Sequence, residues 1–376
     1  MLDFMFSMKK SGLSGILPER RINHKKYLIV FFVLCISVQG FAQDFYFSQY
    51  FNSPIATNPA LTGKIKQDFR VALIHRSQWL SVKTPYMTSS GSFDLNFRKL
   101  IPFFNLMGVG LYFTNDELGT VNDEYFGGVF RNQYVMGSIA GHKTLDNQKR
   151  HTLSFGLQGG MVFKSVNSDK FDFRNQYDGN LQKTLPSGEN LSKLNYNYFN
   201  FNAGLNWDFI ISPVTKMSTG ISVFNLTGPK DSPLGTGSKL GLRYTAHTAL
   251  EYEIGYNITL QPNIYYIYQA GAQNFYPGLI ASYTVDKSGL FENRTFYIGG
   301  WYRLKDSGVA LVGVKEGKYQ IWFSYDFTAS DLNNIQKVPS FNNPRSVMGA
   351  WEISLIYTGF LKRFIPNSRT IPCRFF

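Results

Sequence analysis

The sequence predicts an all-β protein: a transmembrane antiparallel β-barrel of about fourteen strands with an N-terminal plug-like segment. Three observations predict this fold. They are long runs of strict two-residue alternation, a signal-like leader ahead of them, and no later apolar stretch long enough to span as a helix. A period of two puts apolar and polar side chains on opposite faces of a β-strand. A tilted strand needs about 9–11 residues to cross a bilayer, and several runs here are that long.

The clearest alternation covers residues 199–209. Its odd positions are Phe199, Phe201, Ala203, Leu205, Trp207 and Phe209, and its even positions are Asn200, Asn202, Gly204, Asn206 and Asp208. We expect the odd face to contact lipid and the even face to contact water in the lumen. A soluble sandwich would also alternate, but its strands are usually shorter, about 5–6 residues.

Alternation and turn signals together place fourteen strands along the chain. They lie at 69–80, 86–97, 106–115, 125–142, 151–164, 196–210, 214–225, 241–254, 258–269, 274–285, 296–305, 308–316, 318–328 and 347–358. An even number of strands closes an antiparallel barrel with both termini in the periplasm.

The connections between these strands partly follow the rule that periplasmic turns are short and extracellular loops are long. The tight connections are 212–213, 255–257 and Gly317, and the long ones are 165–195, 226–240 and 329–346. Two further connections, at 270–273 and 306–307, are short where the rule predicts long loops. Connection length therefore supports the barrel without proving it.

The first 42 residues have the features of a leader and signal peptide that is removed. Arg20, Arg21, Lys25 and Lys26 precede a twelve-residue apolar run at 27–38, and Gly40-Phe41-Ala42 resembles a cleavage site. The run is too short for a spanning helix, which needs about 20 residues. We expect an aromatic segment at 43–68, the outer-membrane barrel at 69–360 and a C-terminal tail at 361–376.

Composition narrows the class of protein further. Without the leader the formal charge falls from +13 to +9, and Cys373 is the single cysteine, so an internal disulfide is excluded. The mature chain has no basic helix and no run of Lys or Arg, so we expect no nucleic-acid partner. A basic rim facing the phosphates of outer-leaflet lipid explains the charge better than nucleic acid does, and we favour scattered surface lysines over both.

The segment at 43–68 is too aromatic to remain in solution. Its distinguishing residues are Phe45, Phe47, Tyr50, Phe51, Asn58 and Pro59. The segment could enter the periplasmic mouth of the barrel as a plug, or it could dock a periplasmic protein. We favour the plug, because the lumens of larger barrels are often filled.

Motifs for catalysis, metals and cofactors are weak, and we expect no enzyme, metal site or cofactor. His75, His142, His151 and His247 are dispersed, without the spacing of a zinc site. The glycine-rich stretch at 235–239 lacks the spacing of a phosphate-binding loop. Acidic residues at 116–117 and 123–124 lack the ligand pattern of a calcium loop.

Several segments resemble the PorP/SprF family of outer-membrane proteins of the type IX secretion system. They are residues 44–50 (DFYFSQY), 58–63 (NPALTG), 76–79 (RSQW), 115–119 (NDELG), 299–303 (GGWYR), 324–330 (SYDFTAS), 352–355 (EISL) and 373–375 (CRF). Trp351 stands where the family usually has His, and Pro372-Cys373 inverts the usual order.

This resemblance implies a non-enzymatic barrel in the outer membrane of a Gram-negative bacterium. It implies that the protein binds and helps to export, or anchors at the cell surface, a secreted adhesin-like protein with a type IX C-terminal domain, with a link to gliding motility. It also implies contacts with other components of the secretion system in the periplasm and the outer membrane.

Aromatic and apolar residues in the long loops are the candidate partner-binding residues, because such anchors within a polar rim are typical of protein-binding surfaces. They are Phe171, Phe173, Tyr177, Leu181, Val338 and Phe341. The same side chains could instead pack the loops into a lid. The alternative function is a gated transport barrel for a small or hydrophobic solute, and the state of the lumen distinguishes the two.

Overall fold

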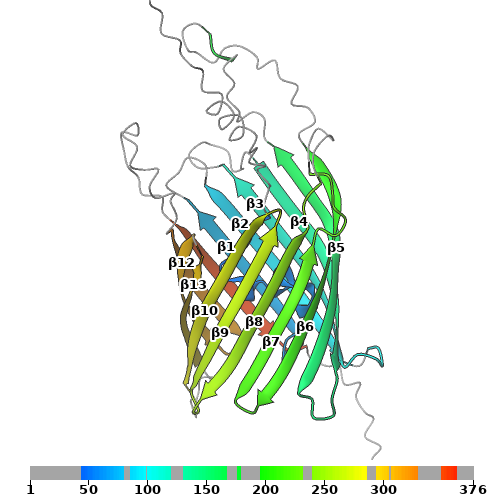
Figure 1. The fold of residues 1–376 in the computed structure, drawn as a ribbon, viewed down its shortest axis with the longest axis vertical. Helices are drawn as coiled ribbons and strands as arrows, with labels where there is room; N and C mark the ends of the chain where they lie inside the picture. Colours follow the sequence, from blue (N-terminus) through cyan, green and yellow to red (C-terminus); the bar gives the residue numbers. More distant parts are fainter. Residues whose placement is uncertain are drawn as a thin grey trace, which may run out of the picture. The chain divides into compact units, whose positions relative to one another are not determined.

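The computed structural model (Figure 1) describes residues 44–79, 85–98, 100–119, 130–166, 176–178, 195–231, 239–285, 294–304, 306–328 and 349–361. The predicted leader at 1–42 and residues 362–376 of the predicted tail lie outside this part of the chain.

In the described residues, fourteen antiparallel strands form one closed barrel. Each strand pairs with its neighbours in sequence, and β1 closes the barrel by pairing with β14. The strands are β1 (Phe69–Gln78), β2 (Tyr86–Arg98), β3 (Leu106–Leu118), β4 (Phe130–Thr144), β5 (His151–Val166), β6 (Tyr196–Ser212), β7 (Thr215–Phe224), β8 (Arg243–Ile254), β9 (Ile258–Gln269), β10 (Ala272–Val285), β11 (Arg294–Arg303), β12 (Ser307–Glu316), β13 (Tyr319–Thr328) and β14 (Ala350–Gly359). The predicted fold and strand number are confirmed.

The predicted strand boundaries are wrong mainly at the third and fourth strands. β3 continues to Leu118 instead of ending at 115, and β4 continues to Thr144 instead of ending at 142, while residues 125–129 of the predicted fourth strand lie outside the described residues. The two strands stay paired beyond the apolar stripe because polar side chains cross between them. Arg131 Nε, for example, donates to Glu117 Oε1 at 2.8 Å. Alternation of apolar and polar residues does not reveal strand pairing that depends on polar side chains, so it gave the wrong end for β3.

Antiparallel pairing gives the barrel two distinct rims. The loop rim is the end at which odd-numbered strands finish, and the connections 167–195, 225–242 and 329–349 begin and end there. The turn rim is the opposite end, which includes the connection at 213–214. The loop rim also has short connections, at 270–271 and at 304–306. In the first, Ala270 (φ 51°) and Gly271 (φ 89°) take the two left-handed positions of a short hairpin.

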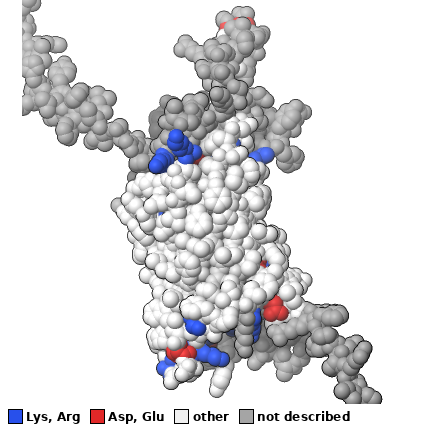
Figure 2. Space-filling model, turned by 90° about the vertical axis from the view of Figure 1, so that its right-hand side faces the viewer, with Lys and Arg blue, Asp and Glu red and all other residues white. Residues whose placement is uncertain are grey.

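The outer face of the barrel is an apolar belt. Figure 2 shows a broad uncharged band between charged groups near the two ends of the visible face. Large side chains such as Leu111, Ile139 and Ile298 point outward along the band. At the turn rim, the rings of His151, Trp207 and Phe209 stack, and adjacent His151 and Phe209 centroids are 4.4 Å apart. An apolar band with aromatic rings at its edge matches the lipid-facing surface of a membrane barrel.

The N-terminal segment lies inside the barrel, where Figure 1 shows it in blue behind the front strands. It contains three short helices: η1 (Tyr50–Asn52), α2 (Pro54–Thr57) and η2 (Pro59–Leu61). Among the described residues, no helix has the length and apolar character needed to cross a membrane.

Candidate functional site

Residues 44–68, which we call the plug, fill the lumen of the barrel. Tyr50 lies in an apolar cluster with inward-facing side chains of β9–β12, and its ring stacks on that of Tyr265 with centroids 4.3 Å apart. The ring of Phe51 packs edge-on against Trp301 and Trp322. Ile55 is fully buried in a second cluster against β3, β4 and β5. The plug expected from the sequence is therefore present, with its aromatic residues against the wall.

The plug extends further than predicted, from the loop rim to the turn rim. At the loop rim, Asp44 N donates to Gln269 Oε1 at 2.9 Å, and Asn225 Nδ2 donates to Asp44 Oδ2 at 2.9 Å. Towards the turn rim, Lys64 Nζ lies 2.5 Å from Asp208 Oδ1. The sequence predicted a plug in the periplasmic mouth, and the structure extends it through the lumen, because inward polar groups near both rims bind it.

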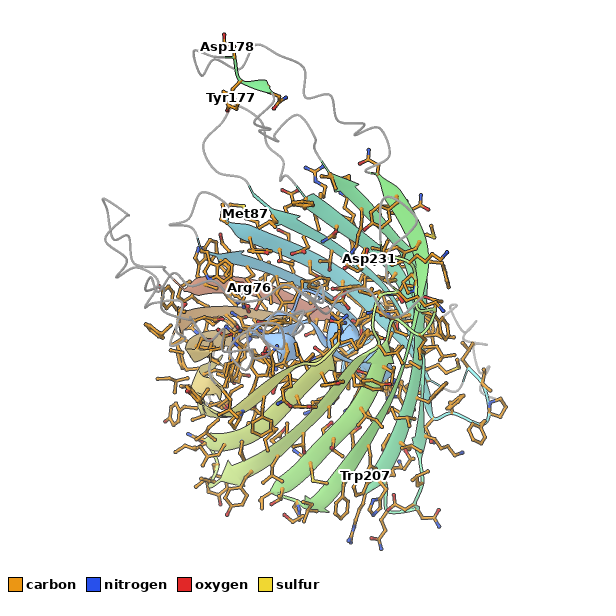
Figure 3. All side chains as sticks on the ribbon, turned by 45° about the horizontal axis from the view of Figure 1, so that its top comes forward. Arg76, Met87, Tyr177, Asp178, Trp207 and Asp231 are labelled. Carbon is orange, nitrogen blue, oxygen red and sulfur yellow. The ribbon has the colours of Figure 1, made fainter. Side chains whose placement is uncertain are left out.

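A buried carboxylate holds the plug backbone near the loop rim. Glu352 on β14 accepts the backbone N–H groups of Ser48 and Gln49, at 2.6 and 2.8 Å. The same carboxylate pairs with Arg76 on β1, and Arg76 also lies 3.1 Å from Asp326 on β13. Figure 3 shows Arg76 beside the plug, within the ring of strands. We call Arg76, Asp326, Glu352, Ser48 and Gln49 the latch.

The latch contains buried charged side chains, and neighbouring groups in the lumen contact them. Tyr46 lies under two guanidinium groups, with Arg76 Cζ 5.8 Å and Arg303 Cζ 5.4 Å from its ring centroid. Ser48 Oγ donates to Asp326 Oδ2 at 2.7 Å. Arg303 pairs with Asp306 and also lies 3.6 Å from Asp326. Two arginines thus face three carboxylates, and buried ions of this kind are tolerated when they are paired and hydrogen-bonded.

A second buried carboxylate fixes the other end of the plug. Asp94 on β2 accepts two hydrogen bonds from the Arg70 guanidinium, at 2.7 and 3.0 Å. Its Oδ2 also accepts the backbone N–H of Gly63 at 2.7 Å. Gly63 has φ 68°, a conformation that glycine adopts without strain. Charged wall residues therefore bind main-chain groups of the plug near both rims.

The Asn58-Pro59 pair lies at a close approach of plug and wall. Asn58 Oδ1 caps η2 by accepting the Ala60 N–H at 2.9 Å, and its Nδ2 donates to the Leu205 carbonyl at 2.9 Å. Pro59 occupies the first position of η2, where no N–H is needed. A Cβ added at Gly156 on β5 would lie 2.2 Å from the Pro59 carbonyl carbon. The wall therefore needs glycine at that position.

Two cavities between plug and wall are small. The cavity lined by Asp44, Tyr112 and Arg243, among others, has a free volume of about 20 Å³, enough for about one water molecule. A second cavity beside Phe47 and Tyr265 is of the same size. The lumen is thus packed where the sequence predicted a wet face, because the plug covers the inward polar groups.

The predicted plug residues lie inside the lumen with varying burial. Phe47 is buried and Tyr50 contacts the wall, while Phe45 packs edge-on against Tyr134 with centroids 5.1 Å apart. Most of the predicted partner-binding residues of the long loops are not among the described residues. Phe171, Phe173, Leu181, Val338 and Phe341 lie outside the described residues, and Tyr177 is half-buried beyond the strand ends in Figure 3.

One of the histidines, His142, contacts the plug. His142 is bound through both ring nitrogens, 2.7 Å from Ser154 Oγ and 2.9 Å from the Thr62 carbonyl, and so takes part in holding the plug. Within the described ranges, no group of three or more His, Cys, Asp or Glu side chains could hold a metal ion.

Sequence reasoning missed the wall residues that bind the plug. Arg76, Asp94, Asp326 and Glu352 lie at inward positions of strands whose other face is apolar, and their charge inside a membrane strand was a usable signal. Their partners are up to 304 residues away in sequence. Local patterns therefore could not pair them.

A closed fourteen-stranded barrel with an apolar belt and a filled lumen defines an outer-membrane β-barrel protein. Residues 39–357 match the family described as "Type IX secretion system membrane protein PorP/SprF". The chain belongs to this family, which confirms the resemblance seen in the sequence and the location in the outer membrane.

Solved structures with a similar outline share little sequence with this chain. The toluene transporter TbuX of Ralstonia pickettii is 11% identical with a TM-score of 0.45, covering 82% of this chain and 94% of its own. TodX, the toluene transporter of P. putida, is 9% identical with a TM-score of 0.45, covering 83% and 95%. A FadL homologue of Pseudomonas aeruginosa is 10% identical with a TM-score of 0.42, covering 80% and 92%. No curated protein matches the chain.

Proposed function

We propose that this barrel is a closed scaffold that binds a secreted, adhesin-like protein at its loop rim and helps to export it or hold it at the cell surface. The observation that carries the proposal is the plug. A lumen filled from one rim to the other, with about one water's volume in each of two cavities, suits a protein-binding scaffold better than a pore.

The arrangement of the connections supports the same function. The longest connections, 167–195 and 329–349, both join strands at the loop rim. Loops displayed on a rigid scaffold are common sites of binding. Long loops of outer-membrane barrels face the exterior, so a partner at this rim would be a secreted or surface protein. Membership of a secretion-system family agrees with such a partner.

The plug makes two other functions less suitable. A transport barrel for a small or hydrophobic solute would need the plug to leave the lumen or move within it, against its contacts at both rims.

An enzyme would need a reactive group activated in an accessible site. The described histidines His142 and His247 are instead buried against the plug or the inner wall. We therefore propose no catalytic activity and no cofactor for this protein.

Affinity capture from detergent extracts tests the proposal. The intact barrel is compared with a variant whose residues 167–194 are replaced by a short Gly/Ser turn, and with a control in which 286–293 at the turn rim is replaced in the same way. The expected result is loss of a secreted, surface-held protein from the first variant alone. Equal capture by all three folded proteins would contradict a role for this loop, and the N-terminal segment would then become the leading candidate for the partner site.

A further inference from the structure

The connection between β2 and β3 forms an exposed projection at the turn rim, far from the latch. Figure 1 shows it in cyan at the lower right, extending sideways from the wall. We call residues 100–105 and the adjacent β4–β5 turn at 145–150 the foot. Leu100 is 61% exposed and Phe103 is 63% exposed. Ile101 and Leu145 are exposed as well, so the foot presents four large apolar side chains to its surroundings.

The foot is fixed against the outside of β4. The Asn105 N–H donates to the His142 carbonyl at 3.0 Å, and Asn105 Oδ1 accepts the Thr144 N–H at 2.8 Å. The ring of Phe104 covers Gly141, where an added Cβ would lie 2.5 Å from a ring carbon. Gly141 is two residues from Ile139 on β4, so it lies on the same outward face, and Ile139 faces lipid. The foot therefore continues the lipid-facing surface at its lower edge.

Basic side chains accompany these apolar groups. Arg98, Lys149 and Arg150 are exposed, and Lys143 Nζ lies 4.9 Å from the Phe103 ring centroid. The acidic group facing them is Asp146, whose carboxylate accepts the His151 N–H at 2.8 Å and the Arg150 N–H at 3.0 Å. These backbone hydrogen bonds, that of His151 first, lower the pKa of Asp146, so it stays ionised. Among the described residues, Lys149 and Arg150 of the foot, with Arg98 and Lys143 next to it in sequence, outnumber Asp146, so this region is basic.

We propose that the foot is a lipid-binding site that inserts into the inner leaflet of the outer membrane and binds the anionic headgroups of phospholipids. Apolar side chains beside lysine and arginine are the composition of a segment that lies in a membrane interface. Two observations select lipid over a protein as the occupant. The foot is continuous with the apolar belt, and the aromatic stack of His151, Trp207 and Phe209, typical of the interface, lies at the same rim.

This site is independent of the proposed partner at the loop rim, since it lies at the opposite end of the barrel. It would fix the tilt and depth of the barrel by adding an anchor on one side of the wall. Anionic lipid would strengthen the anchor, because basic residues near a negatively charged membrane surface are attracted to it within about a Debye length.

Spin-label accessibility measures where the foot lies. The full chain carries Cys35→Ser and Cys373→Ser together with Leu100→Cys, and is labelled with a nitroxide in nanodiscs of phosphatidylcholine with or without phosphatidylglycerol. Tyr256→Cys is the matched control, because Tyr256 is fully exposed in the β8–β9 turn at the same rim. The expected result is that the label at 100 is more accessible to oxygen than to a water-soluble nickel complex, while the label at 256 shows the reverse.

A second variant tests the charges without touching the packing of the foot. Lys149→Gln with Arg150→Gln should remove the effect of phosphatidylglycerol on the label at position 100 and reduce the phosphatidylglycerol that co-purifies with the barrel. The proposal would be overturned by a label at 100 that is as accessible to water as the label at 256 in both lipids. Protection that appears only when a periplasmic protein is added would overturn it too, in favour of a protein partner.

Discussion

The carboxylate of Glu352 accepts the backbone N–H of Ser48 at 2.6 Å, across 304 residues of sequence. This contact joins the last strand of the barrel to the start of the plug. The plug is therefore secured by the same strand that closes the barrel with β1. Closure and plugging are coupled through Arg76 on β1, which pairs with Glu352.

The latch should be a major contributor to stability. Glu352→Ala leaves Arg76 with one carboxylate fewer and two plug N–H groups unpaired, and removing one partner of a buried ion pair costs about 3–5 kcal/mol. Denaturant unfolding of the vesicle-inserted protein measures this cost. The control is Glu253→Ala, which removes a partner of Lys216 from a solvent-exposed ion pair and should cost about 0–1 kcal/mol. Equal losses of stability in the two variants would contradict a major contribution of the latch to stability.

The close contact between Pro59 of the plug and Gly156 of the wall should not tolerate a methyl group. Gly156→Ala would bring a Cβ within 2.2 Å of the Pro59 carbonyl carbon. Overpacking of this kind costs about 1–3 kcal/mol, and we expect the plug to shift and become sensitive to limited proteolysis. Gly308→Ala is the matched control, because no atom lies within 4 Å of its added Cβ. Unchanged proteolysis of the Gly156→Ala plug would contradict the close approach.

The two faces of β6 should both be sensitive to arginine, for different reasons. Leu205→Arg places a charge in the lipid belt and should cost about 2–4 kcal/mol near the bilayer midplane. Asn202→Arg should also destabilise the barrel, because Asn202 is buried between Gln158 and the Asn225 N–H. Refolding into vesicles measures both costs. In a variant lacking residues 44–63 the cost of Asn202→Arg should fall, whereas that of Leu205→Arg should not.

The path of the plug predicts which side of the membrane its first residues face. An epitope inserted between Gln43 and Asp44 should be detected by antibody on intact cells, because Asp44 is bound at the loop rim by Asn225 and Gln269. An epitope in the 255–257 turn should be detected only after permeabilisation. Detection of the first epitope only in permeabilised cells would contradict either the path of the plug or the outward orientation of the loop rim.

The sequence predicted the features of this protein that depend on local patterns. Alternation such as that of Phe199–Phe209 reports the lipid face directly, so the barrel and its number of strands were predictable. The aromatic content of residues 45–51 predicted a plug. The direction of the plug and its latch were not predictable, because they depend on contacts such as Arg76 with Glu352, which only the closed barrel brings together. The same contacts explain why the inward face is packed instead of wet.

The conductance of the purified barrel in planar bilayers tests the closed scaffold most directly. The account predicts no steady conductance for the intact protein and a stable open channel for a variant lacking residues 44–63, with the folded state of both checked by heat-modifiable migration. Steady conductance of the intact barrel, equal to that of the deletion variant, would contradict the account and favour a transport function.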